Sequence, residues 1–116
     1  MIKLVLHIDE QGRWDRVIGN LAHLAAAKQD GKDIDIELVV TGDAVLNILM
    51  SDDYDQDLYN SLAESDKVGF KLRVCHNALN KYNTDDLAVF PFFKIVPAGL
   101  IEIAEREADG YGYVKP

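Results

Sequence analysis

Cysteine is almost absent from this chain of 116 residues, which contains only Cys75. One cysteine cannot form a disulfide within the chain, so the sequence gives no sign of an oxidising compartment. Long apolar runs are also missing, since no stretch approaches the roughly 20 apolar residues that span a bilayer. The apolar segment over residues 2–8 is too short for a signal peptide, and the residues that follow it are acidic. We therefore expect a cytoplasmic protein.

Positive charge is scarce as well, because 12 lysines and arginines face 20 aspartates and glutamates, which gives a net charge of −8. Nucleic acids favour proteins with a clustered positive field, and anionic membranes attract basic segments. The charge therefore argues against both partners. Apolar residues make up 48% of the chain, which is enough for a packed core and excludes overall disorder.

Most motifs that identify a cofactor or metal site are missing. The glycine pattern of dinucleotide folds, the phosphate-binding P-loop, a serine nucleophile elbow and the usual zinc spacing do not occur. An acidic stretch from Asp53 to Glu64 has the carboxylate spacing of a calcium loop. Leu58, however, stands where that loop requires glycine. The sequence therefore predicts no metal and no cofactor.

Strand and helix patterns alternate along the chain. We expect strands over residues 2–8, 34–40, 69–75 and 92–96, and a short edge strand over 111–114. Helices are expected over 14–30, 44–50, 58–63, 76–81 and 100–108, with another short one beginning at 84. Thr84 would be the N-cap of that short helix, and Pro97 would lie in the first turn of the last helix. The alternation predicts a single domain over 1–116, with a three-layer α/β/α fold and a five-stranded, mainly parallel sheet.

Four strand ends should meet at one edge of that sheet, where parallel sheets collect ligands and chemistry. Glycines at strand ends let the backbone approach a ligand, and helix N-termini there favour anions. The expected pocket-lining residues are His7, Gly42, His76, Asn77 and Gly99.

Cys75 ends the third predicted strand and has two interpretations. A lone cysteine in a strand is most often a small, buried and inert residue. Its alternation, however, places it with Lys71 and Arg73, off the core face that Leu72 and Val74 define. It also precedes a predicted helix start, where backbone N–H groups stabilise a thiolate. Such a thiol would be a competent nucleophile or sulfur acceptor.

Two histidines lie close to this position in the predicted sheet. His76 follows Cys75 directly, but adjacent residues of a strand point to opposite faces, so the two side chains need not pair. His7 would approach Cys75 if the first and third strand ends are close. The alternative for either histidine is a packed or solvated side chain without a catalytic role.

Four short segments follow one another in a recognisable order and spacing: LVLHIDE at 4–10, IELVVTG at 36–42, RVCHNAL at 73–79 and IVPAG at 95–99. In this they resemble the DsrE/DsrF-like proteins, and the closing GYGYVKP at 110–116 fits a largely uncharacterised branch of that family. The resemblance implies a DsrE-like three-layer fold and assembly into trimers or hexamers. In the sulfur-relay members a cysteine after the third strand carries sulfur as a persulfide, and Cys75 matches that position. A small-residue helix start follows the cysteine there, whereas His76 and Asn77 follow it here.

Together these observations predict a DsrE-like protein that carries or transfers persulfide sulfur through Cys75 and exchanges it with a donor or acceptor protein. It would act as a carrier more than as a turnover enzyme, because no general base or cofactor motif accompanies the cysteine. Whether it is an enzyme at all stays open. The alternative is a non-catalytic module that binds a small anion, a nucleotide or a neighbouring subunit, with a structural Cys75. Whichever function holds, Tyr111, Tyr113 and Val114, near a sheet edge, are expected to pair or pack between subunits.

Overall fold

A five-stranded sheet forms the middle layer of the protein, whose computed structural model describes residues 1–84 and 88–116. Its strands are Ile2–Ile8 (β1), Ile34–Val40 (β2), Lys71–Cys75 (β3), Lys94–Val96 (β4) and Gly112–Val114 (β5). They lie in the order β4-β3-β2-β1-β5, and each neighbouring pair is parallel. The predictions of a parallel sheet and of a fifth strand at its edge are confirmed.

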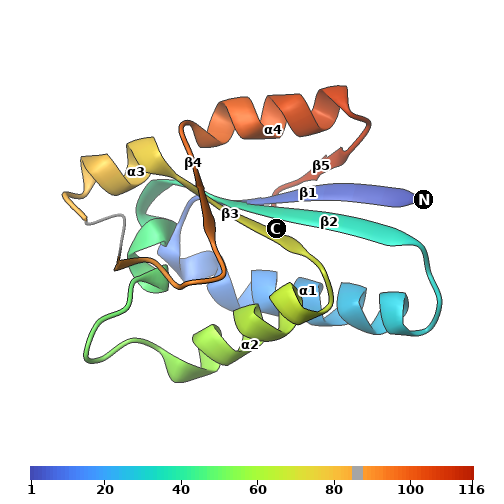
Figure 1. Cartoon of the computed structure of the whole chain (residues 1–116), viewed down its shortest axis with the longest axis horizontal. Coiled ribbons are helices and arrows are strands. Elements are labelled where there is room, and N and C mark those ends of the chain that lie inside the picture. The colour runs from blue at the N-terminus through green and yellow to red at the C-terminus, as the bar shows by residue number, and fades with distance from the viewer. Residues whose placement is uncertain (85–87) are drawn as a thin grey trace.

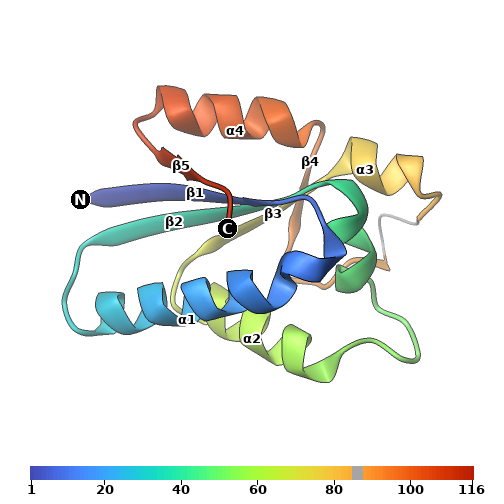
Figure 2. The ribbon, with the colours of Figure 1, turned by 180° about the vertical axis from the view of Figure 1, so that it is seen from behind.

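Helices cover both faces of the sheet, as Figures 1 and 2 show from opposite sides. The helices are Trp14–Gln29 (α1), Gln56–Lys67 (α2), His76–Lys81 (α3) and Gly99–Ala108 (α4), and two 3₁₀ segments span Gln11–Arg13 (η1) and Gly42–Ile48 (η2). In Figure 1, α1 and α2 lie below the sheet, α4 lies above it, and α3 stands at the end where β3 finishes. This arrangement confirms the predicted α/β/α layers.

The larger part of the core lies between the sheet and the pair α1 and α2. Trp14, Val17 and Leu21 recur along one side of α1 and are buried, as the apolar spacing predicts. The helix ends just before Gly31, whose φ of +102° suits glycine at a helix C-terminus. β2 lies at the centre of the sheet and is buried at nearly every position, because helices cover both of its faces.

Several predicted boundaries are wrong, each for a local reason. The helix expected over 44–50 is the 3₁₀ segment η2, because an apolar repeat of three residues fits a 3₁₀ turn as well as an α-helix. β4 covers only Lys94–Val96, since Phe93 closes a turn by donating its N–H to the Phe90 carbonyl. Pro97 precedes α4 instead of lying in its first turn, because Ala98 is the N-cap.

Thr84 does not begin the short helix that was expected after α3. Its backbone N–H and its hydroxyl both donate to the Leu79 carbonyl, so it closes the end of α3. The remainder of that expected helix, residues 85–87, lies outside the described residues. Among the helices of the described ranges, none is long and apolar enough to cross a membrane.

Candidate functional site

A cavity of about 430 Å³ opens where β1, β2 and β3 end and α4 begins. Five of the residues singled out from the sequence line it together: His7, Gly42, Cys75, Asn77 and Gly99. His76 is half-buried as the first residue of α3 and is not among the residues that line the cavity. The cavity lies at the carboxyl edge of the sheet, which is the usual place for a ligand site in a parallel α/β fold.

The sulfur of Cys75 lies against the beginning of α4. Cys75 is the last residue of β3 and is 7% exposed. Its Sγ accepts a hydrogen bond from the backbone N–H of Gly99 at 3.2 Å, and Gly99 is the first residue of the ten-residue helix α4. N–H groups in the first turn of a helix carry partial positive charge, so this contact favours negative charge on the sulfur.

This arrangement corrects two expectations for Cys75. The donor was expected from α3, but in the described part of the chain Cys75 makes no side-chain capping bond to α3. The residue was also expected to lie off the core, whereas α4 covers its side of the sheet and buries it. A sheet with helices on both faces leaves little exposed surface on either face.

Gly99 lets α4 begin this close to the sheet. A Cβ atom at this position would overlap Cγ2 of Thr41 and would lie 3.2 Å from Cβ of Cys75. The N–H of Gly99 reaches the sulfur only because no side chain separates the helix from these two residues. The position therefore needs glycine for space, while its φ is ordinary.

His7 is held by two hydroxyl groups at the same end of the sheet. It is 6% exposed, its Nδ1 lies 2.8 Å from the Tyr113 hydroxyl, and its Nε2 lies 2.7 Å from Oγ1 of Thr41. Burial lowers the pKa of His7, although the Asp9 carboxylate opposes this and Lys115 adds to it. The imidazole is therefore neutral near pH 7, and its nitrogens are engaged by hydroxyls instead of by the Cys75 thiol.

The remaining residues that line the cavity are Asp9, Thr41, Ala78, Ala98 and Leu100. Asp9, Thr41 and Ala98 belong to strand ends expected at this edge, but none of the five was singled out as a pocket residue. Thr41 could have been predicted to line the cavity, because the alternation of β2, continued by one residue, places it beside Cys75 on the face that α4 covers. Tyr113 reaches the site from β5, and no local pattern links it to His7, which lies 106 positions earlier.

Asp9 forms an ion pair with Lys115 at 3.1 Å, so the segment after β5 contacts this edge of the sheet a second time. Within the residues that the structure describes, no three histidine, cysteine, aspartate or glutamate side chains come together as a metal site. The groups that line this cavity include a thiol beside a backbone donor, a neutral imidazole, the Thr41 hydroxyl and the Asp9 carboxylate.

Comparison with known proteins places the chain in a family and relates its fold to solved structures. The profile of the DsrE/DsrF-like family matches residues 7–116. The structure of MTH1491, a protein of unknown function from Methanobacterium thermoautotrophicum, shares 24% identity with a TM-score of 0.83, and both chains are covered completely. The crystal structure of the ychN protein from E. coli shares 16% identity with a TM-score of 0.75, again over both whole chains. Identities this low show the fold alone, and a search of curated proteins found no match.

Proposed function

Because the chain belongs to the DsrE/DsrF-like family, we propose that it is a sulfur carrier that holds sulfane sulfur as a persulfide on Cys75. The observation that carries this proposal is the hydrogen bond from the Gly99 N–H to Sγ of Cys75, inside a cavity at the carboxyl edge of the sheet. A lone structural cysteine needs no helix N-terminus aimed at its sulfur. A thiolate or persulfide gains stabilisation from one.

The transfer step balances without a cofactor. The Cys75 thiolate attacks the outer sulfur of a donor persulfide, forms a new sulfur–sulfur bond and releases the donor as its thiolate. The proton of the donor persulfide stays with the transferred sulfur, or passes to solvent when the new persulfide ionises. The reverse reaction passes the sulfur to an acceptor thiol. The Gly99 N–H can hydrogen-bond to the cysteine sulfur, and the cavity has room for one additional sulfur atom.

Sulfur loading can be measured by intact-mass analysis after incubation with a small-molecule persulfide donor. The wild type should gain the mass of one or more sulfur atoms, the gain should disappear on treatment with a reductant, and Cys75→Ser should gain nothing. Asn77→Ala is a matched control, because it alters the exposed wall of the cavity and keeps the thiol. An unmodified wild type would refute the carrier function.

The burial of Cys75 favours a second candidate function, that of a binding module with a structural cysteine. Thermal-shift measurements with nucleotides and small organic acids distinguish the two. A binding module would be stabilised by one of these ligands, and Cys75→Ala would keep that stabilisation. A sulfur carrier would show sulfur loading and no such shift.

We also propose that the protein assembles with copies of itself, as a trimer or hexamer. Two large apolar side chains near the start of α4 support this, since Leu100 is 73% exposed and Ile101 is 62% exposed. Contiguous exposed apolar surface is a common mark of an interface between proteins. Light scattering should give a multiple of the chain mass, and Ile101→Lys should lower it, while Glu105→Lys on the same helix should have less effect. A wild-type mass of one chain would contradict the assembly.

A further inference from the structure

A carboxylic acid is buried in the centre of the sheet, away from the cavity. Glu37 lies in the middle of β2 and is 0% exposed. Within the described ranges, neither of its carboxylate oxygens accepts a hydrogen bond from an N–H or hydroxyl donor. An ionised carboxylate without a hydrogen bond is so unfavourable in such a place that the group usually takes up a proton instead. None of the chemistry proposed for Cys75 uses this residue.

From β3, one cation reaches Glu37. Arg73 places its Nε 3.7 Å from Oε1 of Glu37. Lys71 stands directly opposite Glu37 in the strand register, but its ammonium group pairs with Asp35 at 3.3 Å and with the Tyr111 hydroxyl. β1 offers only the apolar Val5 at the matching position. The sheet therefore supplies a single, incompletely aligned counter-charge.

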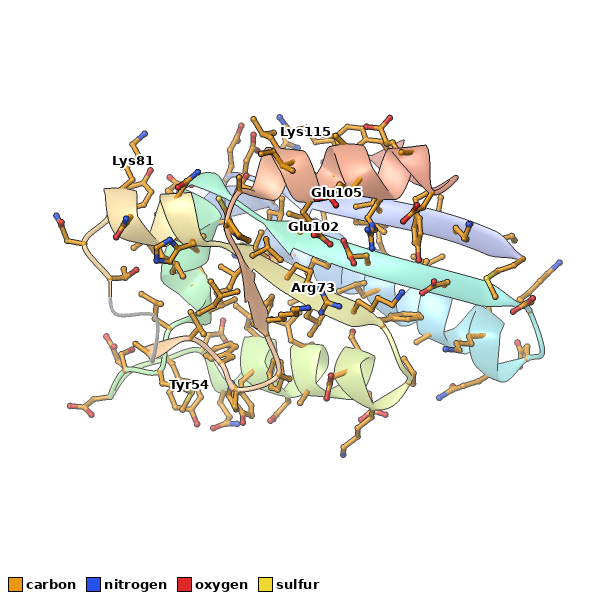
Figure 3. The ribbon with its side chains drawn as sticks, turned by 45° about the horizontal axis from the view of Figure 1, so that its top comes forward. Tyr54, Arg73, Lys81, Glu102, Glu105 and Lys115 are labelled. Carbon is orange, nitrogen blue, oxygen red and sulfur yellow. The ribbon has the colours of Figure 1, made fainter. Side chains whose placement is uncertain are left out.

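On the face of the sheet that α4 covers, this helix places one acidic and one cationic side chain near Glu37, namely Glu102 and Arg106. Glu102 lies in the first turn of α4, and Figure 3 shows it with Arg73 on the face of the sheet that this helix covers. Arg106 follows one turn later. It pairs with Asp109 at 3.2 Å, and its Nε is buried without a partner among the described residues. Two ionised carboxylates cannot donate to each other, whereas a proton on either Glu37 or Glu102 allows a hydrogen bond between them.

The charges around Glu37 act in opposite directions on its protonation. Burial raises the pKa of Glu37 to about 8, and the neighbouring Glu102 carboxyl adds to this, while Arg73 and Arg106 lower it. The acid therefore loses its proton within the range of pH in which a thiol also ionises.

The same helix carries the contact to the sulfur. Gly99 precedes Glu102 by three residues, so the two lie within one turn of each other at the start of α4. A change in the packing of this turn against the sheet therefore changes the Gly99–Cys75 contact as well.

We propose that Glu37 and Glu102 share one proton between the sheet and α4, and that its release loosens the first turn of α4 and exposes Cys75. This goes beyond the sulfur-carrier function and does not depend on it, because it concerns the access of any reagent to the thiol. The shared proton would therefore control whether the first turn of α4 covers Cys75. Two repelling carboxylates under α4 replace one hydrogen-bonded pair when the proton leaves.

The effect on stability has a definite sign. The ordinary pKa of the glutamate is 4.5, and in the folded protein it is raised to about 8. The folded state therefore binds the proton over a range in which the unfolded state has lost it. The stability that depends on this proton is fully present below pH 4.5 and is lost as the pH rises through about 8.

Urea denaturation at a series of pH values between about 5 and 9 tests the proton site. The unfolding midpoint of the wild type should fall with rising pH relative to that of Glu37→Gln, which carries a neutral side chain throughout. Glu102→Gln should reduce the same fall. Glu105→Gln, on an exposed residue of the same helix, should follow the wild type.

The rate of Cys75 alkylation by iodoacetamide tests whether loss of the proton exposes the thiol. From neutral to alkaline pH the wild-type rate should rise several-fold more than that of Glu37→Gln. Equal rises would overturn the coupling to Cys75, and parallel denaturation curves would overturn the proton site. If Glu37→Gln fails to fold, carbon NMR titration of the wild-type carboxyl groups decides. A Glu37 signal that titrates at the ordinary value for glutamate refutes the proposal. Sulfur loading is measured by mass spectrometry, so a failure of the sulfur-carrier function is distinguished from a failure of this proposal.

Discussion

Replacing Gly99 with alanine should destabilise the protein by about 1 to 3 kcal/mol and should accelerate alkylation of Cys75. The new methyl group would overlap Cγ2 of Thr41, and it would also press on Cβ of Cys75 at 3.2 Å. Thr41 cannot rotate away freely, since its hydroxyl is bonded to Nε2 of His7 at 2.7 Å. The start of α4 must therefore move outward, which lengthens the Gly99–Cys75 hydrogen bond. Urea denaturation and thiol alkylation measure the two effects.

Two further variants separate this explanation from a general effect of alanine. Gly19→Ala, in the middle of α1, should stabilise the protein by up to about 1 kcal/mol, because no described atom lies within 4 Å of its new Cβ. Adding Thr41→Ser to Gly99→Ala removes the overlapping methyl group and keeps the hydroxyl that bonds His7. The double variant should recover most of the lost stability. Additive losses would show that the overlap is not the cause.

Replacing Gly42 with alanine should cost on the order of 3 kcal/mol, measured as the loss in the free energy of unfolding. Gly42 has a φ of +57°, and a Cβ atom there would overlap the backbone carbonyl oxygen of Asp9. Backbone atoms cannot rotate out of the way as a side chain can. The Thr41 N–H also donates to the Ile8 carbonyl at 2.9 Å, which fixes the ends of β1 and β2 together.

Gly31 provides the control for Gly42. Its φ is +102°, but a Cβ atom there would have no described atom within 4 Å. Gly31→Ala therefore measures the conformational cost of a left-handed backbone by itself, which is about 1 kcal/mol. A loss at Gly42 no greater than the loss at Gly31 would contradict the proposed overlap with Asp9.

The architecture could be predicted from the sequence because it depends on local periodicity. The apolar run over β1, the stripe along α1 and the apolar half of β2 each specify an element, and their alternation specifies a parallel sheet. Boundaries were predicted less well where several structures satisfy the same pattern. The apolar repeat of η2 fits a 3₁₀ turn and an α-helix equally, and the aromatic residues before β4 resemble a strand.

The site was predictable only in part, because contacts between distant segments decide it. The shared edge of the strands suggested His7, Gly42, His76, Asn77 and Gly99 as neighbours of Cys75, and all of them except His76 line one cavity with it. The donor to the sulfur could not be assigned, since it depends on where α4 docks. Glu37 was missed for the same reason. The alternation along β2 predicts a solvent-exposed side chain at this position. Glu37 is buried because α4 covers that face of the sheet (Figure 1).

The pairing of β5 with β1 determines when the site can form during folding. β1 is the first strand of the chain and β5 is the last, and the hydrogen bond between His7 and Tyr113 joins residues 106 positions apart. Contacts of such long sequence separation form slowly, because the entropy of closing the chain is lost before the contact is gained. During synthesis, His7 emerges early, and Tyr113 becomes available to bond its imidazole only after nearly the whole chain has been made. We therefore expect His7 to be among the last cavity residues to take its final position.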